Sequence, residues 1–379
     1  INHELAGLVR RYRSLDKIIG TYLEKFLETP ILHTSFCNWG TVTGRLSSRE
    51  PNLQNIPRYI INLDDVEMTA DQEQAVRERI EAMMKARKGN TTGNVVGGSS
   101  LSSWAFTGDE DFDDNSPNKI SIRRLFISSP GFKLYSFDYS QMEVRIFLSY
   151  LQSEQILKLM TQENFDFHTE AAKFAFGVSK EHKDFKFYRQ MAKAITFGLI
   201  YGIGLRRLSA QLGLPYLKCY SCSKEFEDAI DQCSCGNRKF ECKARKYRDT
   251  YFENIPGSRD FIKAVQNKAG NVHQVRNRFG RLYTIPEDKE YIAVNYLVQG
   301  TAGDCVSERM IELDRYLEQH NYISRILIQI HDELIMEISE DEEEKLVPKI
   351  KEILEGTPLN IPLVVDVARC SPSWANKGK

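Results

Sequence analysis

Two patterns of apolar residues meet in the stretch 133–150, which reads KLYSFDYSQMEVRIFLSY. Its first five residues alternate between polar and apolar and include two aromatic side chains, which is the pattern of a half-buried β-strand. From Gln141 onward the apolar residues follow helical spacing, at Met142, Val144, Ile146, Phe147 and Tyr150. The sequence therefore predicts a strand followed almost at once by a helix, with Asp138 where the strand ends.

A second stretch gives Asp138 a chemical meaning. A carboxylate at a strand end is fixed by the sheet yet open to solvent, which suits a hard divalent cation, although Asp138 could also simply cap the helix. Residues 326–338, ILIQIHDELIMEI, predict two strands joined by a tight turn at His331 and Asp332. Two aspartates on neighbouring strand ends can hold two Mg²⁺ ions roughly 3.5–4 Å apart, as in-line nucleotidyl transfer requires.

A third stretch, residues 188–202, predicts a helix with a chemical stripe. Arg189, Lys193, Phe197 and Tyr201 recur at every fourth position, so that they lie along one face of a helix with 3.6 residues per turn. Two cations can hold a triphosphate, and two aromatic rings can pack against a sugar and a base. An ordinary amphipathic helix with a cationic rim would show the same pattern.

The overall composition narrows the function only slightly. The chain has 379 residues, 51 basic and 52 acidic side chains and a formal net charge of −1, so a nucleic-acid-binding protein of this kind must concentrate its cations in a groove. No apolar run approaches the ~20 residues of a membrane span, and we expect no membrane partner. No signal peptide is visible, but targeting cannot be judged from a chain that begins at Ile1.

Residues 219–242 form a cysteine-rich segment, CYSCSKEFEDAIDQCSCGNRKFEC. The pairs Cys219–Cys222 and Cys233–Cys235 are separated by about ten residues, and four thiolates at such spacing fit a tetrahedral structural Zn²⁺. Cys242 is a substitute ligand on the same reading. Disulfide bonds are the alternative interpretation.

The first three stretches together resemble the DNA polymerases of family A. DYSQMEVR (138–145) is similar to motif A of that family, RQMAKAITFGLIYG (189–202) to its motif B, and IHDEL (330–334) to its motif C, in the same order and with matching spacing. The resemblance implies an α+β fold of the right-hand type, in which a palm with an antiparallel sheet carries inserted helical fingers. The implied boundaries are 1–40 for the end of the thumb and its junction with the palm, 41–150 and 281–379 for the palm, and 151–280 for the fingers.

The resemblance also implies an activity and a metal site. The chain would be a DNA-directed DNA polymerase, a nucleotidyltransferase that adds dNTPs to a primer 3′-OH and releases pyrophosphate, in DNA replication or repair. Asp138, Asp332 and the main-chain carbonyl of Tyr139 would hold two Mg²⁺ ions, for which Mn²⁺ can substitute. Glu333 would support this site, and Lys193 could protonate the departing pyrophosphate.

Further residues carry over to the substrates. The residues implied at the dNTP are Arg189, Lys193, Phe197, Tyr201, Gln141, Glu143 and His168. Among them, Glu143 resembles the steric gate that leaves no room for a ribose 2′-OH; a helix-surface glutamate is the plain alternative, as a core histidine is for His168. The residues implied at the primer–template DNA are Arg45, Gln54, Asn295, Gln299 and His331.

Two segments depart from the bacterial pattern. Residues 58–120 are much longer than the usual link and include the low-complexity run GNTTGNVVGGSSLSS; a tolerated surface insertion is favoured over a contact with replication proteins. The cysteine-rich residues 218–243 predict a zinc-ribbon-like insertion in the fingers, because an intracellular polymerase argues against disulfide bonds. Its Lys and Arg residues could contact single-stranded template or form a solvated basic face.

Two rival functions and a setting complete the expectations. A single-subunit RNA polymerase of related fold is disfavoured by Glu143, and a catalytically silent relative by Asp138, Lys193 and Asp332. We expect a monomer that works with primer–template DNA and dNTPs in the cytoplasm of a bacterium or a phage-infected host, with an organelle as a further setting. The two insertions point to a phage-encoded or otherwise divergent lineage.

Overall fold

The computed structural model describes residues 9, 12–13, 16, 19–24, 26, 31–56, 61–62, 119–162, 165–357, 359 and 361–377. The chain forms two compact units. The first consists of Ile1–Ser140, Cys305–Gly356 and Val364–Lys379, and the second of Gln141–Asp304 and Thr357–Leu363. The division into thumb, palm and fingers stays a prediction.

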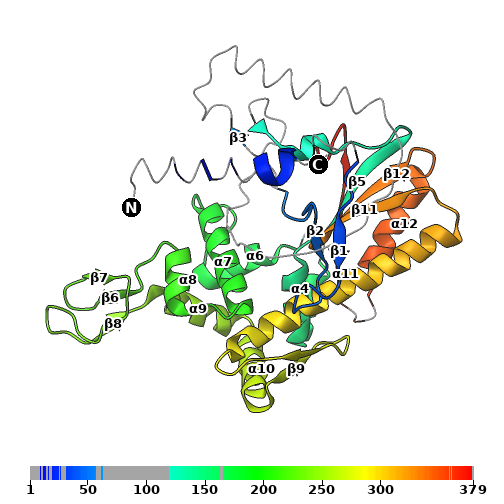
Figure 1. Cartoon of the computed structure of the whole chain (residues 1–379). Helices are drawn as coiled ribbons and strands as arrows, with labels where there is room; N and C mark the ends of the chain where they lie inside the picture. Colours follow the sequence, from blue (N-terminus) through cyan, green and yellow to red (C-terminus); the bar gives the residue numbers. More distant parts are fainter. Residues whose placement is uncertain are drawn as a thin grey trace, which may run out of the picture. The chain divides into compact units, whose positions relative to one another are not determined.

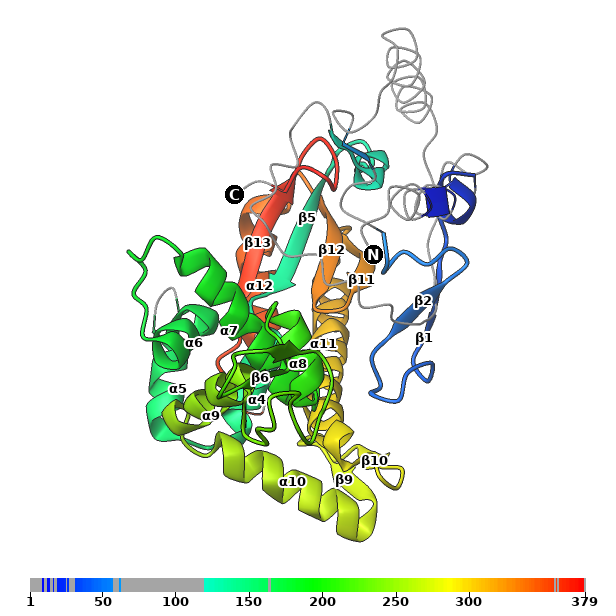
Figure 2. The ribbon, with the colours of Figure 1, turned by 90° about the vertical axis from the view of Figure 1, so that its left-hand side faces the viewer.

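A four-stranded antiparallel sheet is the centre of the first unit. Its order is β11 (Arg325–Ile330), β12 (Glu333–Ser339), β5 (Phe132–Tyr139) and β13 (Val365–Cys370), and the four strands lie side by side in Figure 2. The helix α12 (Glu343–Glu355) packs against β12 and β13. The predicted strand at 133–137 and the predicted pair of strands in 326–338 are both present, with the turn at the predicted position.

A second layer of apolar side chains packs against this sheet. It includes Leu53, Ile122 and Trp374, which are almost fully buried. The chain that supplies them contains the hairpin β1 (Ser35–Cys37) and β2 (Ser47–Arg49), the π-helical turn η1 (Ile19–Leu23) and the 3-10 turn η3 (Ile122–Leu125). The backbone N–H of Trp374 donates to Phe126 (2.9 Å), which anchors the end of the chain on this layer.

The second unit is mainly helical (Figure 1). Its helices are α4 (Met142–Tyr150), α5 (Glu154–Met160), α6 (Phe167–Phe176), α7 (Phe185–Ile200), α8 (Leu205–Gln211), α9 (Lys243–Asn254) and α10 (Ser258–Val272). The helix α6 packs on α7 and α9. On α7 the apolar side is buried, whereas the predicted stripe from Arg189 to Phe197 lies along the half-exposed side, and Tyr201 follows at the C-cap.

The long helix α11 (Ala293–Gln319) begins in the second unit and ends in the first. It follows the hairpin β9 (Gln274–Arg276) and β10 (Leu282–Thr284) and the 3-10 turn η4 (Glu290–Ile292). The glycine at 202 is required by this part of the second unit: its φ is +66°, and a Cβ there would collide with the carbonyl oxygen of Tyr291.

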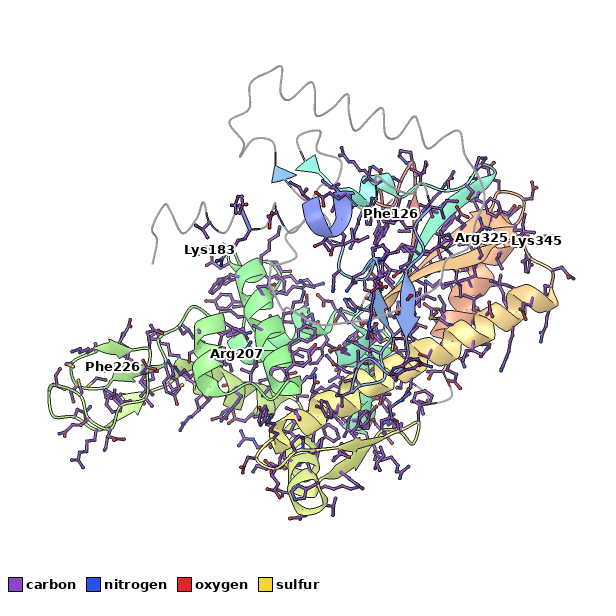
Figure 3. The ribbon with its side chains drawn as sticks, in the orientation of Figure 1. Phe126, Lys183, Arg207, Phe226, Arg325 and Lys345 are labelled. Atoms are coloured by element: carbon purple, nitrogen blue, oxygen red, sulfur yellow. The ribbon has the colours of Figure 1, made fainter. Side chains whose placement is uncertain are left out.

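The cysteine-rich segment folds as a small antiparallel sheet between α8 and α9. Its strands are β6 (Leu217–Cys219), β7 (Glu225–Phe226) and β8 (Phe240–Glu241), in the order β7-β6-β8. Figure 3 shows the side chain of Phe226 in this ribbon and that of Arg207 on α8. Of the predicted insertion 58–120, only β3 (Ile61–Asn62) and β4 (Lys119–Ile120), which pair with each other, are described; the rest of it, like most of residues 1–30, lies outside the described residues.

Candidate functional site

The acidic residues of the first unit gather at one end of its sheet. Asp138, the penultimate residue of β5, is paired in register with Glu333 on β12 and with Asp366 on β13. The backbone N–H of Tyr139 donates to the carbonyl oxygen of Asp332 (3.0 Å). The predicted carboxylates Asp138 and Asp332 therefore stand at adjoining strand ends, with side chains that are 44% and 26% exposed.

The left-handed turn between β11 and β12 positions the second aspartate. His331 has a φ of +52°, a conformation that histidine tolerates better than most residues. It reverses the chain tightly, so that Asp332 stands at the sheet edge while Glu333 already belongs to β12. Because this geometry is local, the sequence could predict it.

Two cations from remote parts of the chain neutralise these carboxylates. The Lys377 Nζ atom lies 2.6 Å from Glu333 Oε1 and 3.4 Å from Asp138 Oδ2. The Arg45 Nη2 atom lies 3.0 Å from Asp332 Oδ1. The Ser136 hydroxyl also donates to Glu333 (2.6 Å). Burial alone would raise the pKa of Glu333, but Lys377 and Ser136 outweigh it and hold that pKa below its ordinary value. Glu333 is thus bound within the protein, as a supporting residue would be.

A chain of amides connects the loop 41–57 to the same turn. The Gln54 amide nitrogen donates to the carbonyl and side-chain oxygens of Gln329 (3.1 and 2.9 Å) and to Leu46 (3.2 Å). Gln329 in turn donates to the carbonyl oxygen of His331. Sequence reasoning missed Gln329, although a polar residue within an apolar strand was a usable signal, since a buried amide needs partners.

A second acidic centre, in the second unit, was also missed. The Asp166 carboxylate accepts from Gln141 Nε2 (3.0 Å), Thr169 Oγ1 (2.6 Å), Arg189 Nε (2.8 Å) and the backbone N–H of His168 (3.2 Å). Burial opposes its ionisation, but the bonds from Arg189 and Thr169 outweigh this and lower the pKa of Asp166 to about 2. Its position as the N-cap of α6, two residues before His168, was the available signal.

The imidazole of His168 is held in its neutral form. It is 4% exposed, and burial is the main cause that lowers its pKa to about 4, with Lys193 and Arg189 acting in the same direction against Asp166. Its ring lies 5.6 Å from that of Phe197. Within the described part of the chain, its Nδ1 atom has no hydrogen-bond partner. A buried, unpaired ring nitrogen beside two cations is suited to meet a ligand.

The remaining predicted residues fall on helices. The Tyr201 hydroxyl donates to Glu143 Oε2 (2.6 Å), and the Phe197 and Tyr201 rings are stacked with centroids 5.9 Å apart. Asn295 and Gln299 are half-exposed on α11, one turn apart. These contacts join the predicted gate, Glu143, to the aromatic end of the predicted stripe.

The four predicted cysteines come together in the ribbon. The sulfurs of Cys219 and Cys235 are 3.6 Å apart and those of Cys222 and Cys233 are 3.5 Å apart, and all four lie within 4.8 Å of one another. Cys242 is not among the four. The backbone N–H of Cys222 is the main cause that lowers the pKa of the Cys219 thiol to about 6. All eight cysteines of the chain are free thiols.

Among the described residues, no helix has the length and apolar character needed to cross a bilayer.

Comparison with known proteins places these observations in a family. The family model described as DNA polymerase family A matches residues 1–94 and 112–376. The chain is 30% identical over 381 residues to the thermostable DNA polymerase I of Thermus thermophilus, covering 96% of this chain and 36% of that protein. It is 28% identical over 387 residues to DNA polymerase I of Pseudomonas aeruginosa, covering 98% and 33%. The chain thus spans about a third of the length of the curated relatives it matches.

A solved structure has the same fold. It is the POL domain of Pol1 from M. smegmatis in complex with DNA primer-template and dNTP, with a TM-score of 0.65 and 24% identity over 98% of this chain and 52% of that one. The stretch that the family model leaves unmatched, 95–111, falls inside the segment 58–120 that the sequence set apart as an insertion.

Proposed function

The chain belongs to DNA polymerase family A, and on this premise we propose that it catalyses template-directed addition of dNTPs to a primer 3′-OH. The observation that carries the proposal is the pair of solvent-reaching carboxylates, Asp138 and Asp332, on adjoining strand ends of the first unit. The stripe of two cations and two aromatic rings on α7 supports it from the second unit.

The donor set of the first unit fits Mg²⁺. Asp138 and Asp332 offer carboxylate oxygens, which are the hard ligands that Mg²⁺ prefers, and the main-chain carbonyl of Tyr139 would complete the set. Bound there, two ions would supply activation of the primer hydroxyl and neutralisation of the leaving pyrophosphate. Mn²⁺ offers the same chemistry. Lys377 and Arg45 would have to release the carboxylates, because they contact the same oxygen atoms.

The second unit supplies groups for a nucleoside triphosphate. Arg189, whose Nε is held by Asp166, and Lys193 would bind the phosphates, and Lys193 would give the leaving group its proton. Neutral His168 would add a hydrogen bond through its unpaired ring nitrogen. Gln141, which bridges Asp166 and the backbone N–H of Phe167, would fix the start of α4 beside them.

The aromatic end of the stripe would read the sugar. Phe197 would lie against the deoxyribose, and the hydrogen bond from Tyr201 holds the Glu143 carboxylate in place. A carboxylate fixed in this way would leave no space for a 2′-OH, which accounts for a preference for dNTPs. The primer–template duplex would be contacted by Arg45, Gln54, Asn295, Gln299 and His331.

Primer extension tests the proposal directly. Wild type should extend a primed DNA template in Mg²⁺ with dNTPs and not with rNTPs, and Asp138→Asn should lower kcat by about 10³-fold or more, since it removes one metal ligand. The matched control is Asp341→Asn, which removes an exposed carboxylate beyond the opposite end of β12. Equal activity of the two variants, or extension with rNTPs alone, would contradict the assignment.

We propose further that the four clustered cysteines hold a structural Zn²⁺. Four sulfurs bound at about 2.3 Å to one Zn²⁺ would lie about 3.8 Å apart, close to the two separations of 3.5 and 3.6 Å. Metal analysis of protein purified without chelators should find one zinc per chain, retained in Cys242→Ser and lost in Cys222→Ser combined with Cys235→Ser. Zinc-free wild type would sink the site.

A further inference from the structure

Charge is separated along the cysteine ribbon and the helix that follows it. Residues 225–231 contain four acidic side chains and no cation, whereas 238–246 contain five cations and one acid. All five cations are exposed. We call them, together with Tyr220, the basic edge; its cations are Arg238, Lys239, Lys243, Arg245 and Lys246.

An exposed aromatic ring lies beside these cations. Tyr220 is 67% exposed, and its backbone N–H donates to the carbonyl oxygen of Lys239 (3.2 Å), which continues the pairing of β6 with β8. Asn237 fixes Lys239 from the other side, because its amide donates to the Lys239 carbonyl (3.0 Å) and its oxygen accepts from the Lys239 N–H (3.1 Å). The same amide contacts the Cys219 sulfur (3.5 Å). The ring and the cation are therefore held by the core of the ribbon.

The cations of the basic edge have no internal use. On the acidic side, Glu225 is paired with Lys218 (3.4 Å) and Asp228 with Arg206. Across the residues that the structure describes, none of the five cations of the basic edge forms an ion pair with an acidic side chain. Three of them stand in the first turn of α9, which contains no acid, where the helix dipole disfavours positive charge. Folding alone therefore does not account for them, and a surface that merely needs hydration mixes both signs.

We propose that the basic edge binds single-stranded nucleic acid, which in the polymerase proposed above is the unpaired template strand; the identity of the strand rests on that proposed function. Phosphates would meet the row of cations, and a base would stack on the exposed face of Tyr220. Cationic grooves with exposed aromatic rings bind single strands with little regard to sequence. The aromatic ring favours a nucleic acid over an acidic protein, which would need only the cations.

Binding of the full chain to a fluorescein-labelled dT oligonucleotide of about 12 nucleotides, followed by anisotropy over a series of salt concentrations, tests the proposal. Arg238→Gln combined with Lys239→Gln should weaken binding about tenfold and reduce the slope of log K against log salt by about 1.4, or about 0.7 per lost phosphate contact. The control with equal charge change is Lys263→Gln with Lys268→Gln, two exposed lysines of α10, and should change affinity less than twofold.

The ring gives an independent test. Tyr220→Ala should weaken binding at least about fivefold, whereas Tyr220→Phe keeps the stacking face and should bind like wild type. Equal affinities for the basic-edge and control variants, or an unchanged Tyr220→Ala, would overturn the proposal and leave a solvated face or a protein-binding surface. Because oligonucleotide binding needs no catalysis, this outcome is independent of primer extension: an inactive wild type that still binds dT would contradict the polymerase assignment alone.

Discussion

The sheet edge of the first unit and the cysteine ribbon of the second both gather groups that repel one another once ionised, but they are stabilised in different ways. At the sheet edge, Lys377 and Arg45 already neutralise the carboxylates of Asp138, Glu333 and Asp332. In the ribbon, the described contacts of the four sulfurs are with one another, with the Ser234 hydroxyl and with the Asn237 amide, and none of these partners is a cation.

This difference teaches how each site would treat a metal. An edge that is balanced by its own side chains can exist without Mg²⁺ and can exchange it during turnover. A cluster of thiols without a counter-cation depends on the metal for its stability, because ligand binding is then part of the folding free energy. The experiments below test this contrast, beginning with the largest expected effect.

Removing the metal should unfold only the ribbon. With a strong chelator, or in Cys233→Ser, amide hydrogen exchange in 216–242 should accelerate by about 100-fold or more, while β5 and β12 keep their protection, since structural zinc sites are folded by their metal. The control is Cys305→Ser, which changes a buried cysteine of α11 outside the cluster. Unchanged exchange in the ribbon would mean that the thiols need no metal.

Acid should act on the second unit before it reaches the sheet edge. The pKa of His168 is about 4 in the folded state, below its ordinary value of 6.5, so the unfolded chain binds its proton first as the pH falls. Unfolding free energy should therefore fall by roughly 2–3 kcal/mol between pH 6.5 and 4. Denaturant titrations across this range should show the loss in wild type and a flatter profile in His168→Gln. An identical profile in both would remove this role from His168.

The Asp166 centre is a third case, an acid satisfied wholly by protein donors. Its folded pKa of about 2 lies below the ordinary 3.8, so its contribution of about 2 kcal/mol is present above pH 3.8 and lost as the pH falls toward 2. Asp166→Asn should remove that contribution at neutral pH. It should also raise KM for dNTP about tenfold, with a smaller change in kcat, because Arg189 loses the acceptor that holds its Nε.

The KM effect can be separated from a general loss of structure. Glu170→Gln removes a carboxylate from the same helix whose partner, Lys173, is only a neighbour on the helix surface. This variant should leave KM for dNTP within about twofold of wild type. Equal KM values for Asp166→Asn and Glu170→Gln would show that Asp166 acts on stability alone.

The smallest effect is expected from Lys377→Met. The lysine competes with Mg²⁺ for Asp138, so its loss should lower the Mg²⁺ concentration for half-maximal activity by about two- to threefold and enlarge the rise in Tm that Mg²⁺ produces. Lys351→Met, which breaks a surface pair with Glu355, serves as control. A higher Mg²⁺ requirement in Lys377→Met would show that the lysine helps to assemble the site instead.

Local patterns predicted most of the fold that surrounds these sites. The strand ending at Asp138, the turn at His331 and the stripe on α7 depend on residues close in sequence, and the structure confirms all three. The partners that complete the centres were missed because they come from far along the chain: Lys377 is 239 residues from Asp138, and Arg189 is 23 residues from Asp166. Periodicity carries no information about such pairs.

The cysteine segment shows a finer limit. Its spacing predicted four ligands but could not decide whether Cys242 replaces one of them, because a loop of several residues can bring either thiol to the same point. The structure decides it through β8, which ends at Glu241 and leaves Cys242 at the N-cap of α9. The lineage and the role of residues 58–120 depend on no contact that the described residues make, and stay predictions.

The pairing of β6 with β8 makes the ribbon an interchangeable cassette. Lys218 and Glu241 are direct partners in the ladder, so the chain leaves the helical body and returns to it at points about one strand spacing, roughly 5 Å, apart. A tight turn of a few residues could close the same gap between α8 and α9. Evolution could thus have added, exchanged or lost this cassette in a single event, without rebuilding the helices on either side.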